Sequence, residues 1–150
     1  NDSVRVQSKV TKKQGPGDAY SFVLKKNAGR IGKKPQWKQY DDGDFDCLIT
    51  TIVEDDQLVG VLVVPTHELA ARGLVGVAKK KSSSLTVHLA SSRPKRRDSK
   101  EAKEWQQKYF FDFANGPLCA ADQQRLRSLL LSCCRGWTEQ TEITLDMILK

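Results

Sequence analysis

The feature that most constrains this chain is a pair of apolar segments joined by a short polar turn. Residues 45–53 read FDCLITTIV and residues 58–64 read LVGVLVV, with EDDQ between them. Nearly continuous runs of Val, Ile and Leu are typical of central strands that are covered on both faces. Pro65 cannot donate a hydrogen bond to a sheet ladder, so it ends the second segment. The pattern predicts two adjacent central strands around which the rest of the chain folds.

Three further segments have the character of strands, at 3–11, 19–26 and 84–90. In the first, valines alternate with polar residues, which predicts a half-buried strand whose valines face the core. The turn KKQGPGD follows it, so the first two segments are expected to form a hairpin or near-hairpin. Residues 27–44 are Gly-containing and basic, and we expect them to form a loop.

Helices are predicted mainly in the second half of the chain. The first covers residues 66–75, with Thr66 as its cap and Gly73 as its stop. The second extends to residue 113, because Asp98 and Glu101 have capping-box spacing and aromatic residues recur every four positions behind them. The third covers 119–134, and the tail at 138–150 is expected to be a fourth short helix or a docking segment.

The order of these elements predicts the fold class. Strands come first and helices gather toward the C-terminus, so we expect an α+β (mixed α/β) domain with a central sheet of about five strands. A chain of 150 residues fits a single domain. Because it begins without Met on a strand-like segment, we expect it to be the C-terminal part of a longer protein or of a longer domain. No apolar run approaches the roughly 20 residues of a membrane span, so no membrane partner is expected.

Cysteine and histidine usage argues against a zinc site or a disulfide framework. The four cysteines are irregularly spaced, and no histidine lies near them at ligand spacing. They are Cys47, Cys119, Cys133 and Cys134. We expect mostly buried, reduced thiols in a reducing intracellular compartment, whether nuclear, organellar or cytoplasmic. The two histidines, His67 and His88, are interpreted as structural.

Charge is distributed in blocks. Residues 1–40 carry ten Lys/Arg and two acids, residues 41–78 carry one and eight, and residues 79–110 carry ten and three. The two basic blocks are dense and interleaved with Gly and Ser, a composition that favours phosphate contacts over a solvated helix face. We therefore expect a nucleic-acid partner, DNA ahead of RNA. The predicted contact residues are Lys12, Lys13, Arg30, Lys33, Lys34, Trp37, Tyr40, Arg93, Lys95, Arg96 and Arg97.

The stretch VQSKV, residues 6–10, carries one further signal. A strand with Gln, any residue and Lys, then a basic turn, a second strand and an apolar hairpin that ends in VVP resembles the later half of a PD-(D/E)xK nuclease domain in its Gln variant. The resemblance implies that Gln7 and Lys9 are catalytic, with Gln7 also a ligand of Mg²⁺ or Mn²⁺. In that family the metal-binding acids lie upstream of this strand. We therefore expect hydrolysis only if an upstream part supplies them, and none from this chain alone.

Two functions from different classes follow from these patterns. The first is a nucleic-acid-binding domain that resembles a metal-dependent endonuclease. The alternative is a non-catalytic basic subunit or docking domain of a larger ribonucleoprotein or organellar assembly, with other protein subunits as partners. In the second case Gln7 and Lys9 form an ordinary solvated strand face.

Overall fold

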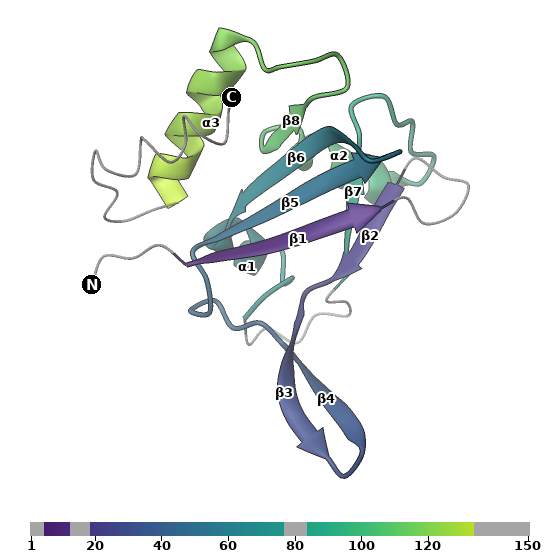
Figure 1. Cartoon of the computed structure of the whole chain (residues 1–150), viewed down its shortest axis with the longest axis vertical. Helices are drawn as coiled ribbons and strands as arrows, with labels where there is room; N and C mark the ends of the chain where they lie inside the picture. Colours follow the sequence, from purple (N-terminus) through teal and green to yellow (C-terminus); the bar gives the residue numbers. More distant parts are fainter. Residues whose placement is uncertain (1–4, 13–18, 77–83, 134–150) are drawn as a thin grey trace.

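The computed structural model describes residues 5–12, 19–76 and 84–133, and the α+β class is confirmed (Figure 1). Strands precede most of the helical structure along the chain, as the sequence predicts. The elements are, in order, β1 (Val6–Lys12), β2 (Ala19–Val23), β3 (Lys25–Ile31), β4 (Lys34–Gln39), β5 (Cys47–Glu54), β6 (Gln57–Pro65), α1 (Thr66–Ala71), β7 (Ser84–His88), α2 (Arg97–Gln106), β8 (Phe110–Asp112) and α3 (Ala120–Cys133).

The main sheet has four strands in the order β1-β5-β6-β8. The predicted central hairpin is confirmed as β5 and β6, which pair antiparallel from Cys47 opposite Pro65 to Glu54 opposite Gln57. Asp55 and Asp56 form its turn at φ values of 46° and 60°. Two consecutive residues in the left-handed region are what a two-residue hairpin turn requires, and Asp tolerates that region better than most side chains.

The strand pairing differs from the prediction in three respects. β1 lies parallel to β5 and does not form a hairpin with β2. β2 pairs instead with β7, so the five predicted strands exist but are divided between two sheets. The expected loop at 27–44 contains most of a third, two-stranded sheet, because β3 and β4 form an antiparallel hairpin that extends away from the body of the domain (Figure 1).

The faces of β1 are also reversed relative to the prediction. Val6 and Val10 are 49% and 66% exposed, whereas Gln7 and Lys9 are half-buried and Thr11 is buried. Hydrophobicity alone predicts that the valines face the core. β1 is an edge strand, and it is the polar side chains that face β2 and the segment before β5.

Apolar side chains cover the main sheet on both faces. One cluster joins Leu48 and Ile52 of β5 to β2, β7, α1 and α2, through residues such as Tyr20 and Leu69. The second joins Cys47 of β5 to α3, whose buried side chains are Leu126, Leu130 and Cys133. This arrangement covers both faces of β5. It also explains why β5 is apolar at nearly every position.

The second helix is shorter than predicted. α2 ends at Gln106, and the chain turns into β8, where Phe110 is buried in the first core cluster and Phe111 in the second. Two consecutive side chains on opposite faces of a sheet require a strand, so the aromatic spacing that suggested a continuous helix was misleading. Arg125 of α3 fixes the turn by donating to the backbone oxygens of residues 107, 108 and 110.

The predicted helix caps are not used. The cap position of α1 is Pro65, and the Thr66 hydroxyl donates to the backbone oxygen of Phe45 at 2.6 Å. The cap position of α2 is Arg96, with no side-chain hydrogen bond to the first turn, so the capping box of Asp98 and Glu101 does not form. Gly73 does end α1 with a φ of 68°, as predicted.

A glutamine closes the outer edge of β7. Gln106 is fully buried, and its side-chain amide donates to the Thr86 backbone oxygen at 2.7 Å and accepts from the His88 backbone N–H at 3.0 Å. The side chain therefore makes the two hydrogen bonds that a neighbouring strand would make.

The remaining predictions concern the thiols, the tail and membranes. Cys47 and Cys133 are buried, Cys119 is exposed, and none of the three is in a disulfide. Cys134, Lys13, the side chain of Lys12 and the tail at 138–150 lie outside the described residues. Within the described part of the chain, no helix has the length and apolar character needed to cross a membrane.

Candidate nucleic-acid interface

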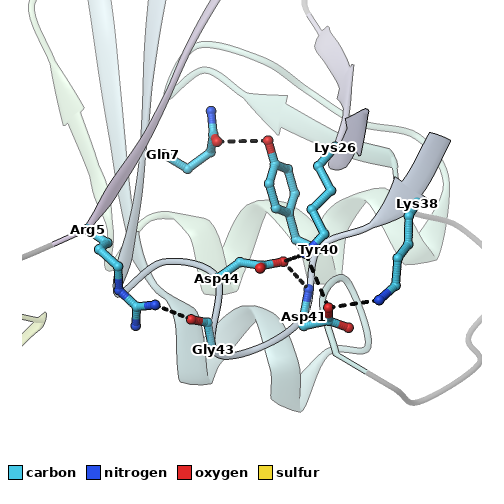
Figure 2. A network of polar contacts seen from close by, with 8 residues as sticks. All are labelled: Arg5, Gln7, Lys26, Lys38, Tyr40, Asp41, Gly43 and Asp44. Carbon is cyan, nitrogen blue, oxygen red and sulfur yellow. Dashed lines mark hydrogen bonds and ion pairs between the residues drawn. The ribbon is translucent and has the colours of Figure 1, made fainter. Parts of the chain in front are cut away.

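Gln7 and Lys9 share the inner face of β1, as strand alternation requires. The Gln7 side-chain oxygen accepts a hydrogen bond from the Tyr40 hydroxyl at 2.8 Å, and its NH₂ group donates to the backbone oxygen of Ser8 at 2.9 Å. Tyr40 also packs edge-on against Phe45, with ring centroids 5.2 Å apart. Gln7 thus joins the edge strand to the segment that enters β5, and Tyr40 is half-buried in that contact (Figure 2).

The segment before β5 contains several acids, and basic side chains or backbone N–H groups bind three of them. Asp46 accepts from the Arg5 backbone N–H at 3.0 Å and pairs with the Arg5 guanidinium at 3.3 Å. The hydrogen bond from the Arg5 backbone N–H, and then the contact with the Arg5 side chain, hold the pKa of the Asp46 carboxyl below its ordinary value. Arg5 also donates to the Gly43 backbone oxygen, so it ties the start of β1 to this acidic segment (Figure 2).

Asp41 and Asp44 converge on the ammonium group of Lys26, at the base of the β3–β4 hairpin (Figure 2). Lys26 pairs with Asp44 and lies 3.2 Å from Asp41, while Lys38 reaches Asp41 at 3.1 Å. The Asp44 carboxylate raises the pKa of Lys26, and Lys26 in turn lowers the pKa of Asp44. Lys38, followed by Lys26, lowers the pKa of Asp41. These ion pairs anchor the hairpin to the domain.

The geometry does not fit a magnesium or manganese site. Such an ion prefers several carboxylate and carbonyl oxygens that converge on one point. Here the two convergent carboxylates already surround an ammonium group, and the Gln7 oxygen is bound by Tyr40. Across residues 5–12, 19–76 and 84–133, no three His, Cys, Asp or Glu side chains are placed to hold a metal ion. The Lys9 side chain has no hydrogen bond or ion pair with the rest of the described chain.

The β3–β4 hairpin carries only positive charges among its ionisable side chains. Residues 25–39, which we call the basic hairpin, contain six Lys/Arg and no acid. Lys26 and Lys38 are held at its base. The remaining four are exposed and form no ion pair within the described chain. They are Lys25, Arg30, Lys33 and Lys34.

Large apolar side chains accompany these charges. Trp37 is 60% exposed on β4, and Ile31 is 73% exposed at the end of β3. Trp37 is therefore free to stack on a base, whereas Tyr40 is held by Gln7 and Phe45. The sequence prediction included Arg30, Lys33, Lys34 and Trp37 but missed Lys25 and the anchoring role of Lys26 and Lys38. The abrupt change from six cations to the acids of DDGDFD was the signal for that anchor.

The second predicted cluster lies in another part of the molecule. Arg93, Lys95, Arg96 and Arg97 are exposed on the segment that leads into α2. In Figure 1 α2 lies far from the hairpin tip, so the two basic clusters are separate surfaces. Arg97 pairs with Glu101 at 2.9 Å, whereas the other three form no ion pair among the described residues.

The comparisons with known proteins find a similarity at the level of the fold. No family model and no curated protein matches the chain. A solved structure titled "Crystal Structure of MepB" is similar, with a TM-score of 0.59 and 17% sequence identity over 71% of this chain and 70% of that one. At this identity the similarity shows a shared fold.

Proposed function

We propose that this chain is a nucleic-acid-binding domain whose principal contact is the basic hairpin. The observation that carries the proposal is the set of four unpaired, exposed cations on a two-stranded projection that also exposes Trp37. Ion pairs at the hairpin base hold this charge in place without neutralising it.

The chemistry of such a surface suits a polyphosphate backbone. Lys and Arg that neutralise phosphates release condensed counterions, which supplies most of the affinity of non-specific binding. An exposed Trp adds base stacking, which is worth about 1–3 kcal/mol per base.

The shape of the hairpin supports DNA ahead of RNA. The major groove of B-form DNA is wide enough for a two-stranded β-ribbon. The major groove of A-form RNA is deep and narrow, and side chains do not read it. The β3–β4 hairpin is a two-stranded ribbon of the kind that the major groove of DNA admits.

In this proposal the domain derives from a PD-(D/E)xK nuclease fold and retains its ability to bind nucleic acid. Gln7 and Lys9 have the shared strand face that such a site needs, but the carboxylates of Asp41, Asp44 and Asp46 are paired with cations. Hydrolysis with Mg²⁺ or Mn²⁺ therefore stays a prediction about a protein that supplies further acids.

A Trp37 series tests the proposal. The full chain is titrated into fluorescently labelled single-stranded and duplex DNA and RNA, and binding is followed by anisotropy. We expect Trp37→Ala to weaken single-strand binding by about 5-fold or more, and Trp37→Phe, which keeps a ring to stack, to restore most of it. Leu58→Ala, which removes another exposed apolar side chain, is the control. Absence of binding at low salt would reject the proposal and favour the docking-domain alternative.

A further inference from the structure

A small hollow beside α2 has the chemistry of an anion site. It has a volume of about 200 Å³ and is lined by His88 from β7, Ser99 from the first turn of α2, and the basic residues Arg93, Lys95 and Arg96 between them. This is below the roughly 300–1,000 Å³ of pockets for drug-sized ligands, so a small group fits it better than a nucleoside.

The helix supplies backbone donors at this place. α2 has ten residues, and its cap position, Arg96, makes no side-chain hydrogen bond to the first turn. The first backbone bond of the helix runs from the Lys100 N–H to the Arg96 oxygen. The preceding N–H groups, those of residues 97–99, have no acceptor within the described chain. Free N–H groups at a helix start attract anions through hydrogen bonds and the helix dipole.

His88 is the independent observation that points to a ligand. His88 is only 5% exposed, and it lines both the hollow and a larger groove of about 760 Å³. Its imidazole makes no hydrogen bond to any described residue, and its ring nitrogens are not among the fully buried unpaired polar atoms of the described chain, so they are accessible to a ligand. A neutral imidazole carries one N–H donor, which a ligand in the hollow could satisfy.

The charges around His88 favour an anion. Burial, followed by the charge of Lys103, lowers the pKa of His88, so its ring is neutral at neutral pH. Lys103 donates to the backbone oxygens of Ala90 and Ser92 at 2.6 Å each, which fixes the loop that forms one wall. The acids of α2 nearest to this place, Asp98 and Glu101, line the larger groove and not the hollow.

We infer that this hollow binds a phosphate group, held by the α2 N-terminus, His88 and Arg96. The phosphate is either the end of a nucleic-acid strand or that of a small free phosphate ester, since both present the same oxygens. The first source rests on the proposed function, whereas the site itself does not.

Inorganic phosphate is the first probe. It is added to the isotopically labelled full chain at constant ionic strength, with chloride as the balancing anion, and NMR follows the Asp98 and Ser99 amides and the His88 ring. We expect saturable shifts at these three residues. Arg96→Gln is expected to weaken binding about tenfold, the loss of a hydrogen bond to a charged group. Arg97→Gln removes the same charge one residue later, outside the hollow, and is expected to change binding less than twofold.

A second arm identifies the source. The affinity of one oligonucleotide is compared with and without a 5′-phosphate. Tighter binding of the phosphorylated form, lost in Arg96→Gln, indicates a strand end. Equal affinities alongside phosphate binding indicate a small ester. Lys33→Gln with Lys34→Gln on the basic hairpin should leave inorganic phosphate binding unchanged, so failure of the proposed function is distinguishable from failure of the site. Absence of shifts at His88 and Ser99, or equal affinities of the Arg96 and Arg97 variants, would overturn the inference.

Discussion

Neutralising the tip of the basic hairpin should reduce the salt dependence of DNA binding by a calculable amount. The hairpin offers four unpaired cations, and each phosphate neutralised contributes about 0.9 to the slope of log K against log salt for duplex DNA. If all four bind phosphates, the slope is about −3.6, and affinity falls about 150-fold between about 50 and 200 mM salt. Lys33→Gln with Lys34→Gln leaves two contacts, which gives a slope of about −1.8 and a fall of about 12-fold.

Anisotropy titrations of a labelled duplex across that salt range provide the measurement. Lys100→Gln with Lys108→Gln is the matched control, because both lysines are exposed, lie outside the hairpin and carry the same total charge. The control should keep the wild-type slope. Equal slopes for the two double variants would show that net charge, and not the hairpin, governs binding, and the reasoning from the hairpin would be wrong.

Three further predictions concern the body of the domain. Gly60→Ala places a Cβ 2.4 Å from the buried Phe110 ring, so a denaturant titration should show a loss of about 1–3 kcal/mol in the free energy of unfolding. Because the folded state lowers the pKa of Asp44, the ionised carboxylate adds to the free energy of unfolding above the ordinary carboxyl pKa range, and this addition is lost as the pH falls below it. Unfolding titrations at pH 6 and about pH 3 should therefore show a smaller decrease in the free energy of unfolding on acidification for Asp44→Asn than for the wild type. Under native conditions a thiol reagent should label Cys119 and spare the buried Cys47, as mass spectrometry of digested protein would show; rapid labelling of Cys47 would contradict the packing described.

The sequence is informative where local pattern and final environment agree. β5 and β6 are predictable because both faces of the sheet are covered, so their apolar runs need no decision about which side is buried. α3 is predictable because Leu126, Leu130 and Cys133 recur at helical spacing, and this side of the helix packs on the sheet. In both cases the local sequence is enough to predict the secondary structure.

The sequence predictions are wrong where a residue or strand distant in the sequence determines which side chains are buried or paired. The sequence of β1 does not show that its neighbour is β5, or that its valines stay exposed while Gln7 bonds to Tyr40, 33 residues away. The spacing of Trp105, Tyr109 and Phe113 fits a helical stripe until Phe110 and Phe111 are seen to enter different core clusters. Among the candidate contacts, the hairpin cations were recognised from composition, but their separation into paired and unpaired groups depends on the acids that reach Lys26 and Lys38.

The buried amide of Gln106 has a consequence for how this protein behaves in concentrated solution. An unpaired strand edge is a template on which other chains add and aggregate, and small sheets are especially exposed to it. In the β2–β7 pair, the side chain of Gln106 saturates the outward N–H of His88 and the outward oxygen of Thr86. Self-association through β7 would first have to break both bonds and strand a buried amide, at a cost of about 1–3 kcal/mol for each unpaired group. A single helical side chain thereby caps that edge of the two-stranded sheet.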